Sequence, residues 1–166
     1  MDEISAKKTD DSYELEIPLY NGQITLDLRA FLAGAGVVRV RKILQLIDKE
    51  TWGDVRDKLL DEMENACGRL LDSDLPKEGE ARRERVEEAK AELRDARSAL
   101  VGVKLARKPA NEEDRRQLDF QLRKLDAEVA AAKDRLACAL FDLRAISKGE
   151  VQVRKALEVI RAWRRK

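Results

Sequence analysis

Apolar residues recur at alternating spacings of three and four in two long stretches of the chain. This spacing places them along one stripe of an α-helix and leaves the charged residues on the other faces. In residues 81–106 the stripe consists of Val86, Ala89, Leu93, Ala96, Leu100 and Val103. In residues 118–146 it consists of Leu118, Leu122, Leu125, Val129, Ala132, Leu136, Ala139, Leu143 and Ile146. The pattern predicts two helices that meet along these stripes as a coiled coil.

The segment between the two stripes predicts a chain reversal. Pro109 cannot continue a helix, and the side chain of Asn111 can cap the helix that follows. We therefore predict an antiparallel coiled-coil helical hairpin over 77–147, with its turn near 107–111. At about 1.5 Å per residue its first helix is roughly 40 Å long, so we expect the hairpin to project from the rest of the protein.

A fold about Pro109 predicts one register for the hairpin, in which Leu100 faces Leu118 and Leu93 faces Leu125. One flank then pairs opposite charges, namely Lys104 with Glu112, Arg97 with Asp119 and Lys90 with Asp126. The other flank pairs like charges, namely Arg85 with Arg135 and Glu92 with Glu128. The like-charge flank leaves room for a second chain.

Period-two alternation marks the start of the chain instead. In 13–28 two alternating runs flank Asn21-Gly22, which favours a β-hairpin with a type I′ turn. We expect residues 1–12 to be a flexible terminus. Residues 13–72 should form a base in which the hairpin packs on two helices, at about 37–49 and 52–72.

Two further features complete the predicted architecture. Residues 71–80 combine Asp, Ser, Pro and Gly, which predicts a boundary between the base and the helical hairpin. Residues 150–166 predict a separate basic C-terminal helix that packs on the base. The predicted fold class is mainly α with a minor β part.

Composition narrows the classes of function. Charged residues make up 40% of the 166 residues, but 34 cations balance 33 anions, so the net charge of +1 creates no global attraction to nucleic acid or membrane. No apolar run is long enough to span a membrane, and the first residues carry mixed charge, unlike a signal peptide. We expect a soluble, cytoplasmic protein without a membrane partner.

Candidate chemistry is sparse. The chain contains no histidine, which removes the usual acid/base and nucleophile pairs and most zinc sites. Cys67 and Cys138 lie far apart in helical patterns and fit no metal-binding spacing. We therefore expect a protein that is not an enzyme, with no catalytic residues, no metal and no cofactor.

Apolar residues near the predicted turn suggest a protein-binding site instead. Leu105 and Phe120 fall off the stripes and would serve as anchors, with Arg107 and Lys108 as a charged rim. The leading hypothesis is a non-catalytic binding module or adaptor that engages a protein partner through its coiled-coil arm and tip. A structural protein that self-associates, for example as a homodimer, is a variant of this class.

A basic face is the alternative site, and its cations would contact the phosphates of a nucleic acid. The protein would then be a nucleic-acid-associated accessory or inhibitor protein of the mobile-element type. Its residues come from two distant segments, namely Arg39, Arg41, Lys42, Arg161, Arg164, Arg165 and Lys166. Cations at a helix C-terminus are also favoured by the helix dipole, so a purely structural role for the last three stays open.

Overall fold

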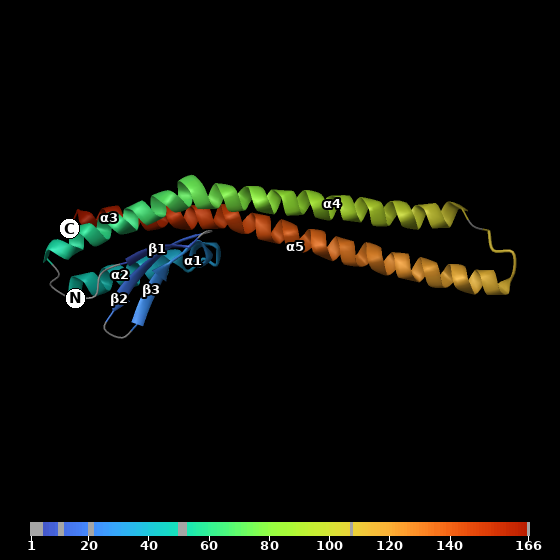
Figure 1. Cartoon of the computed structure of the whole chain (residues 1–166), viewed down its shortest axis with the longest axis horizontal. Coiled ribbons are helices and arrows are strands. Elements are labelled where there is room, and N and C mark those ends of the chain that lie inside the picture. The colour runs from blue at the N-terminus through green and yellow to red at the C-terminus, as the bar shows by residue number, and fades with distance from the viewer. Residues whose placement is uncertain (1–4, 10–11, 20–21, 50–52, 107, 166) are drawn as a thin grey trace. The chain divides into compact units, whose positions relative to one another are not determined.

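The computed structural model describes residues 5–9, 12–19, 22–49, 53–106 and 108–165, and side chains are described from residue 26 onward with the exception of 47–55, 107 and 166. The protein is mainly helical (Figure 1). It divides into two compact units: unit 1 consists of Met1–Glu80 and Arg144–Lys166, and unit 2 consists of Ala81–Leu143.

Three strands begin unit 1: β1 (Ser5–Thr9), β2 (Ser12–Leu19) and β3 (Gly22–Leu26), in antiparallel order β1-β2-β3. The type I′ turn was predicted at Asn21-Gly22; Asn21 lies outside the described residues, and Gly22 is the first residue of β3. The hairpin as predicted, and its packing on helices, therefore stay predictions. β1 lies in the segment predicted to be flexible, and its SAKKT sequence has no large apolar residue that could have indicated a strand.

A short helix that the sequence did not predict, α1 (Leu28–Leu32), follows the strands. The Asp27 side chain caps it, because its Oδ1 accepts a hydrogen bond from the Ala30 amide at 2.8 Å. Gly34 then adopts a φ of +81°, which favours glycine. A Cβ on Gly36 would lie 2.1 Å from the buried Phe31 ring. Both glycines are therefore explained by the fold of this connection.

The core of unit 1 joins segments that are distant in sequence. It is formed by α1, α2 (Gly36–Lys49), α3 (Gly53–Arg69), the start of α4 (Leu75–Ala106) and the end of α5 (Glu112–Arg164). The predicted helix over 37–49 is confirmed by α2. The large side chains with relative exposure below 2% are Phe31, Leu26, Leu44, Leu59, Leu60, Met63, Leu70, Ile160 and Val40.

The predicted boundary at 71–80 is not a loop. A π-helical turn, η1 (Leu70–Asp74), links α3 directly to α4, and the Leu75 amide donates to the Leu70 carbonyl. Leu70 and Leu75 are 1% and 3% exposed, so burial on both sides of the turn holds the backbone helical. Pro76 follows directly after the π-helical turn, at the second residue of α4. Core packing thus overrides the local Pro and Gly signals.

The predicted start of a separate C-terminal helix at 150 is also wrong, because α5 continues through this region to Arg164. Gly149, just before the predicted start, is buried. A Cβ there would lie 2.8 Å from the Leu32 Cδ2 atom and 3.3 Å from the Leu75 Cδ2 atom. The glycine therefore allows close packing of a continuous helix.

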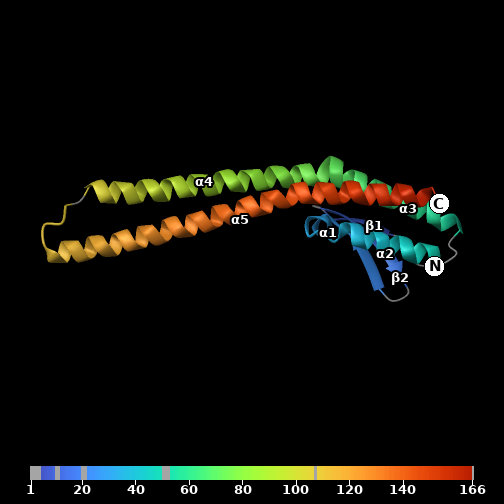
Figure 2. The same ribbon diagram turned by 180° about the vertical axis from the view of Figure 1, so that it is seen from behind.

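In unit 2 the α4 and α5 segments run antiparallel, side by side (Figure 1, Figure 2). Leu93, Val129 and Ala132 are buried between them, with Ala96, Leu100 and Leu136 packed against this cluster. The predicted cap of the second helix is confirmed: Asn111 Oδ1 accepts a hydrogen bond from the Asp114 amide at 2.8 Å. The predicted helix over 81–106 is confirmed by α4.

The predicted register of this hairpin is wrong by about one heptad. Leu93 packs with Val129 and Ala132 instead of Leu125. Arg135 Nε donates to Glu92 Oε2 at 2.7 Å, and Arg82 Nη1 donates to the Asp142 carbonyl at 2.6 Å. A stripe that repeats every seven residues aligns equally well after a shift of seven.

The observed register brings opposite charges together on the flank that was predicted to pair like charges. Arg135 now meets Glu92, where the predicted register set Arg135 against Arg85 and Glu92 against Glu128. The three predicted opposite-charge pairs do not form; Lys90 pairs with Glu87 and Arg116 pairs with Glu112 within their own helices. The shift also leaves the first turns of α5 extending beyond the last turn of α4 (Figure 2).

Candidate functional site

The turn of unit 2 exposes two large apolar side chains. Leu105, in the last turn of α4, is 82% exposed, and Phe120, in the third turn of α5, is 72% exposed. Lys108 is exposed in the connecting segment, whereas Arg107 lies outside the described residues. Exposure of this size costs an isolated protein hydrophobic free energy, which makes the pair a candidate contact site.

Phe120 belongs to one face of α5. The shallow groove around it is lined by Glu112, Glu113, Arg116, Gln117, Phe120 and Gln121. These residues recur at i, i+4 and i+8, so they follow a single helix face. A partner that covers Phe120 would therefore also meet carboxylate and amide groups.

A second exposed phenylalanine lies farther along α5. Leu140 and Phe141 fall off the apolar stripe and are 37% and 69% exposed. Phe141 is 21 positions after Phe120, so both occupy the same place in the seven-residue repeat. This equivalence makes Phe141 a matched control for Phe120.

The residues of the alternative basic face are placed unevenly. Arg39 lies 3.8 Å from Asp27. Arg164 forms a hydrogen bond with Asp61 and lies 4.0 Å from Glu64, both on α3. The hydrogen bond to Asp61 raises the pKa of Arg164 above its usual value.

Four other members of this face are exposed, namely Arg41, Lys42, Arg161 and Arg165. Lys166 lies outside the described residues. Unit 1 does bring the two source segments into one core, since Val40 of α2 and Ile160 of α5 belong to the same cluster. Two of the seven cations nevertheless have carboxylate neighbours.

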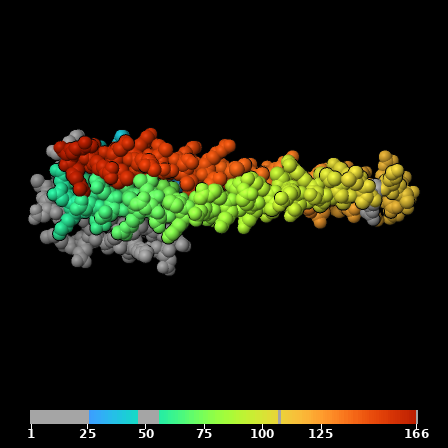
Figure 3. All heavy atoms as spheres, turned by 90° about the horizontal axis from the view of Figure 1, so that it is seen from above, coloured from blue at the N-terminus to red at the C-terminus, as the bar shows by residue number. Residues whose placement is uncertain are grey.

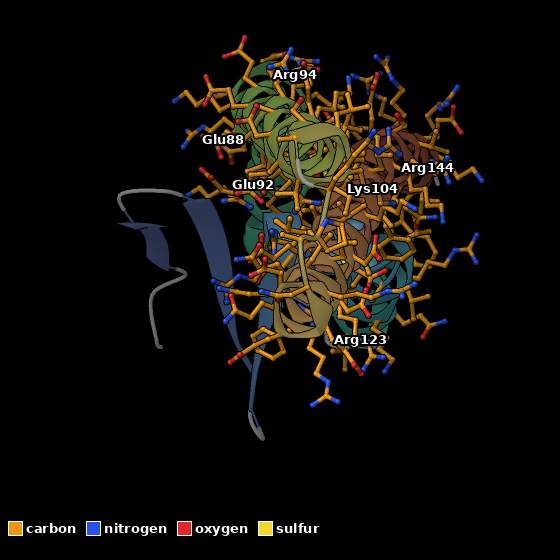
Figure 4. All side chains as sticks on the ribbon, turned by 90° about the vertical axis from the view of Figure 1, so that its right-hand side faces the viewer. Glu88, Glu92, Arg94, Lys104, Arg123 and Arg144 are labelled. Carbon is orange, nitrogen blue, oxygen red and sulfur yellow. The ribbon has the colours of Figure 1, made fainter. Side chains whose placement is uncertain are left out.

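A basic stripe on α4 was not predicted from the sequence. Lys90, Arg94, Arg97, Val101 and Lys104 follow one another at spacings of four, three, four and three, and each directly follows a residue of the apolar stripe. This spacing was the available signal, but Lys90, Arg97 and Lys104 were assigned to pairs with the second helix. Figure 4 shows Lys104 on the side of α4 opposite Glu88 and Glu92, with Arg94 projecting from its outer side.

The basic stripe borders a groove of about 690 Å³. Leu93, Val101 and Leu136 supply its apolar lining, and Lys90, Arg94 and Arg97 supply its cations. Val101 is 52% exposed. The outer face of α4 along this part of unit 2 is open in the space-filling view (Figure 3).

The cysteines offer no activated nucleophile in unit 1. Cys67 is fully buried, and burial, assisted by Glu64, raises the pKa of its thiol to about 12. Cys138 of unit 2 is exposed. Within the described ranges, no three or more Cys, Asp or Glu side chains group so that they could hold a metal ion.

No protein-family model matches the chain, and no match was found among curated proteins or solved structures. Among the helices that the structure describes, none is both long and apolar enough to cross a lipid bilayer.

Proposed function

We propose that this protein is a non-catalytic protein-binding module, in which unit 2 engages a protein partner near its turn. The observation that carries the proposal is the exposure of Leu105 and Phe120, at 82% and 72%. Apolar anchors of this kind, surrounded by polar side chains, supply most of the free energy at protein interfaces. Lys108 and Arg107 would form the charged rim.

In this proposal the α4–α5 pair acts as a coiled-coil arm, and the N-terminal β-hairpin packs on the small helical base of unit 1. The absence of histidine and the raised pKa of Cys67 support a non-catalytic role. No cofactor takes part.

Affinity capture with tagged protein in native lysate tests the proposal, with and without nuclease treatment. Phe120→Asp should reduce the retained partner at least tenfold, because a carboxylate cannot replace a buried ring at an interface. Phe141→Asp is the matched control, since it makes the same change on the same helix at similar exposure. Circular dichroism spectra of both variants should match the parent, because neither side chain is buried.

Equal capture by Phe120→Asp and Phe141→Asp would remove the turn from consideration. Loss of every partner after nuclease treatment would favour the alternative, a nucleic-acid accessory protein that uses the basic face. That alternative has weaker support, because Arg39 and Arg164 already have carboxylate neighbours. A mass in solution of twice the monomer would favour the self-associating variant.

A further inference from the structure

We propose that the basic stripe of α4 is a second docking surface, which binds an acidic amphipathic helix of a partner protein. The inference rests on the proposed function as a binding module, but it uses a surface distinct from Leu105 and Phe120. Its basis is the combination of an apolar floor, unpaired cations and seam-like spacing on one helix face.

The spacing of the stripe matches what a third helix requires. Residues that alternate at three and four positions stay aligned with a neighbouring helix over several turns. From Lys90 to Lys104 the stripe is about 21 Å long at 1.5 Å per residue, which is enough for roughly four turns of a docked helix. The stripe is also rigid, because it lies wholly within α4.

The floor of the groove supplies apolar contact. Val101 is 52% exposed, and Leu93 and Leu136 line the groove beside it. Gly102 also borders the groove, and a Cβ built on it would meet no other atom within 4 Å. This open space can accept a branched or aromatic side chain from the docked helix.

The cations of the stripe favour a docked helix of negative charge. Within the part of the chain that the structure describes, Arg94, Arg97 and Lys104 have no ion-pair partner, whereas Lys90 pairs with Glu87 at 2.7 Å. A helix with carboxylates beside its apolar stripe would place opposite charges next to these cations, whereas a basic helix would place like charges there.

Nucleic acid fits the groove less well. Single-stranded nucleic acid binds through aromatic side chains that stack on bases, and no aromatic residue lines this groove. The exposed aromatic residue near the turn, Phe120, borders a different groove with two glutamates. The chemistry therefore points to an acidic helix of a protein.

A designed peptide pair tests the proposal with the full-length protein. The first peptide is an acetylated, amidated helix of about 18 residues with leucine at alternating spacings of three and four and glutamate on both flanks. The second replaces every glutamate with lysine. Fluorescence anisotropy of labelled peptides at low salt should show binding of the glutamate peptide at least tenfold tighter than the lysine peptide.

Charge reversal sharpens the test. Arg94→Glu combined with Arg97→Glu should lower the affinity for the glutamate peptide at least tenfold and allow the lysine peptide to bind. Both side chains are exposed, so the helical content should not change. Gly102→Gln should lower the affinity for the glutamate peptide, because the new side chain fills the open space. The helix itself should not be destabilised, because replacing glycine within a helix favours folding.

Several results would overturn the proposal. These are no measurable binding of the glutamate peptide, equal binding of both peptides, or undiminished binding to the reversed variant. A dimer that the reversal dissociates would also overturn it, because the occupant would then be a second copy. Loss of capture by Phe120→Asp together with an inert stripe would leave the proposed function standing and remove only this inference.

Discussion

Unit 1 and unit 2 bury apolar side chains in different ways. In unit 1, large residues from α1, α2, α3, α4 and α5 share one core, and Phe31, Leu60 and Ile160 are fully buried. In unit 2, two helices share a narrow seam, where Leu93 and Val129 are still 8% exposed. Irregular interlocking specifies a single arrangement, whereas a repeating seam is compatible with several registers.

The largest expected effect comes from Phe31→Ala in unit 1. Removing a fully buried ring should cost about 3 to 5 kcal/mol of unfolding free energy, because it leaves a cavity between α1 and Gly36. Urea denaturation monitored by tryptophan fluorescence measures it, since Trp163 packs against the core of unit 1. A loss below about 1 kcal/mol would contradict the tight packing described for this unit.

A smaller effect is expected from Leu93→Ala in unit 2. The loss should be about 2 kcal/mol, near the low end for leucine, because the seam surrounds Leu93 less completely than a globular core would. The circular dichroism midpoint should fall by more than the tryptophan midpoint. Equal shifts in both signals would show that the two units unfold as one.

Alkaline pH should weaken unit 1 through Cys67. The folded thiol has a pKa of about 12, whereas an unfolded thiol ionises near its ordinary value. Between about pH 9 and pH 12 the unfolded state therefore holds fewer protons, and stability should fall by up to about 1.4 kcal/mol per pH unit.

Urea titrations at several alkaline pH values measure this slope. Cys67→Ala should remove the thiol's part of it, and Cys138→Ser should not, because Cys138 is exposed. An identical slope in the Cys67→Ala variant would show that Cys67 is not the titrating group.

The smallest effect concerns the register of unit 2. A double-mutant cycle on Glu92 and Arg135 should give a coupling of about 0.2 to 1 kcal/mol, because both side chains are more than half exposed. The same cycle on Arg85 and Arg135, which the alternative register would set side by side, should give none. A repulsive coupling there would restore the register predicted from the sequence.

The sequence predicted the helices of unit 2 well and their alignment badly. The apolar stripe identified residues such as Leu93 and Val129, and Pro109 and Asn111 located the turn. The register was unresolved because a fold centred on Pro109 assumes a symmetric turn, whereas the structure lets α5 extend past α4. In unit 1, the Asp, Ser, Pro and Gly residues of 71–80 predicted a boundary, whereas the backbone stays helical there because Leu70 and Leu75 are buried on both sides of the turn.

The candidate sites were predictable to a different degree. Leu105 and Phe120 were identified because they fall off the stripe, and both are exposed. The basic stripe was not identified, because the predicted register, which is wrong, assigned Lys90, Arg97 and Lys104 to partners on α5. Whether a charged residue is paired depends on alignment, which local sequence does not contain.

The hydrogen bond from Arg82 to the Asp142 carbonyl joins the two ends of unit 2. Unit 1 needs those ends close together, because it is assembled from chain segments on both sides of 81–143. Closing a flexible loop of this length would cost roughly 3 to 4 kcal/mol in chain entropy. Once the helical hairpin has formed, its two ends already lie close together, so much of this entropy cost has been met before unit 1 assembles. We therefore expect the hairpin to form early in folding and to speed the assembly of unit 1.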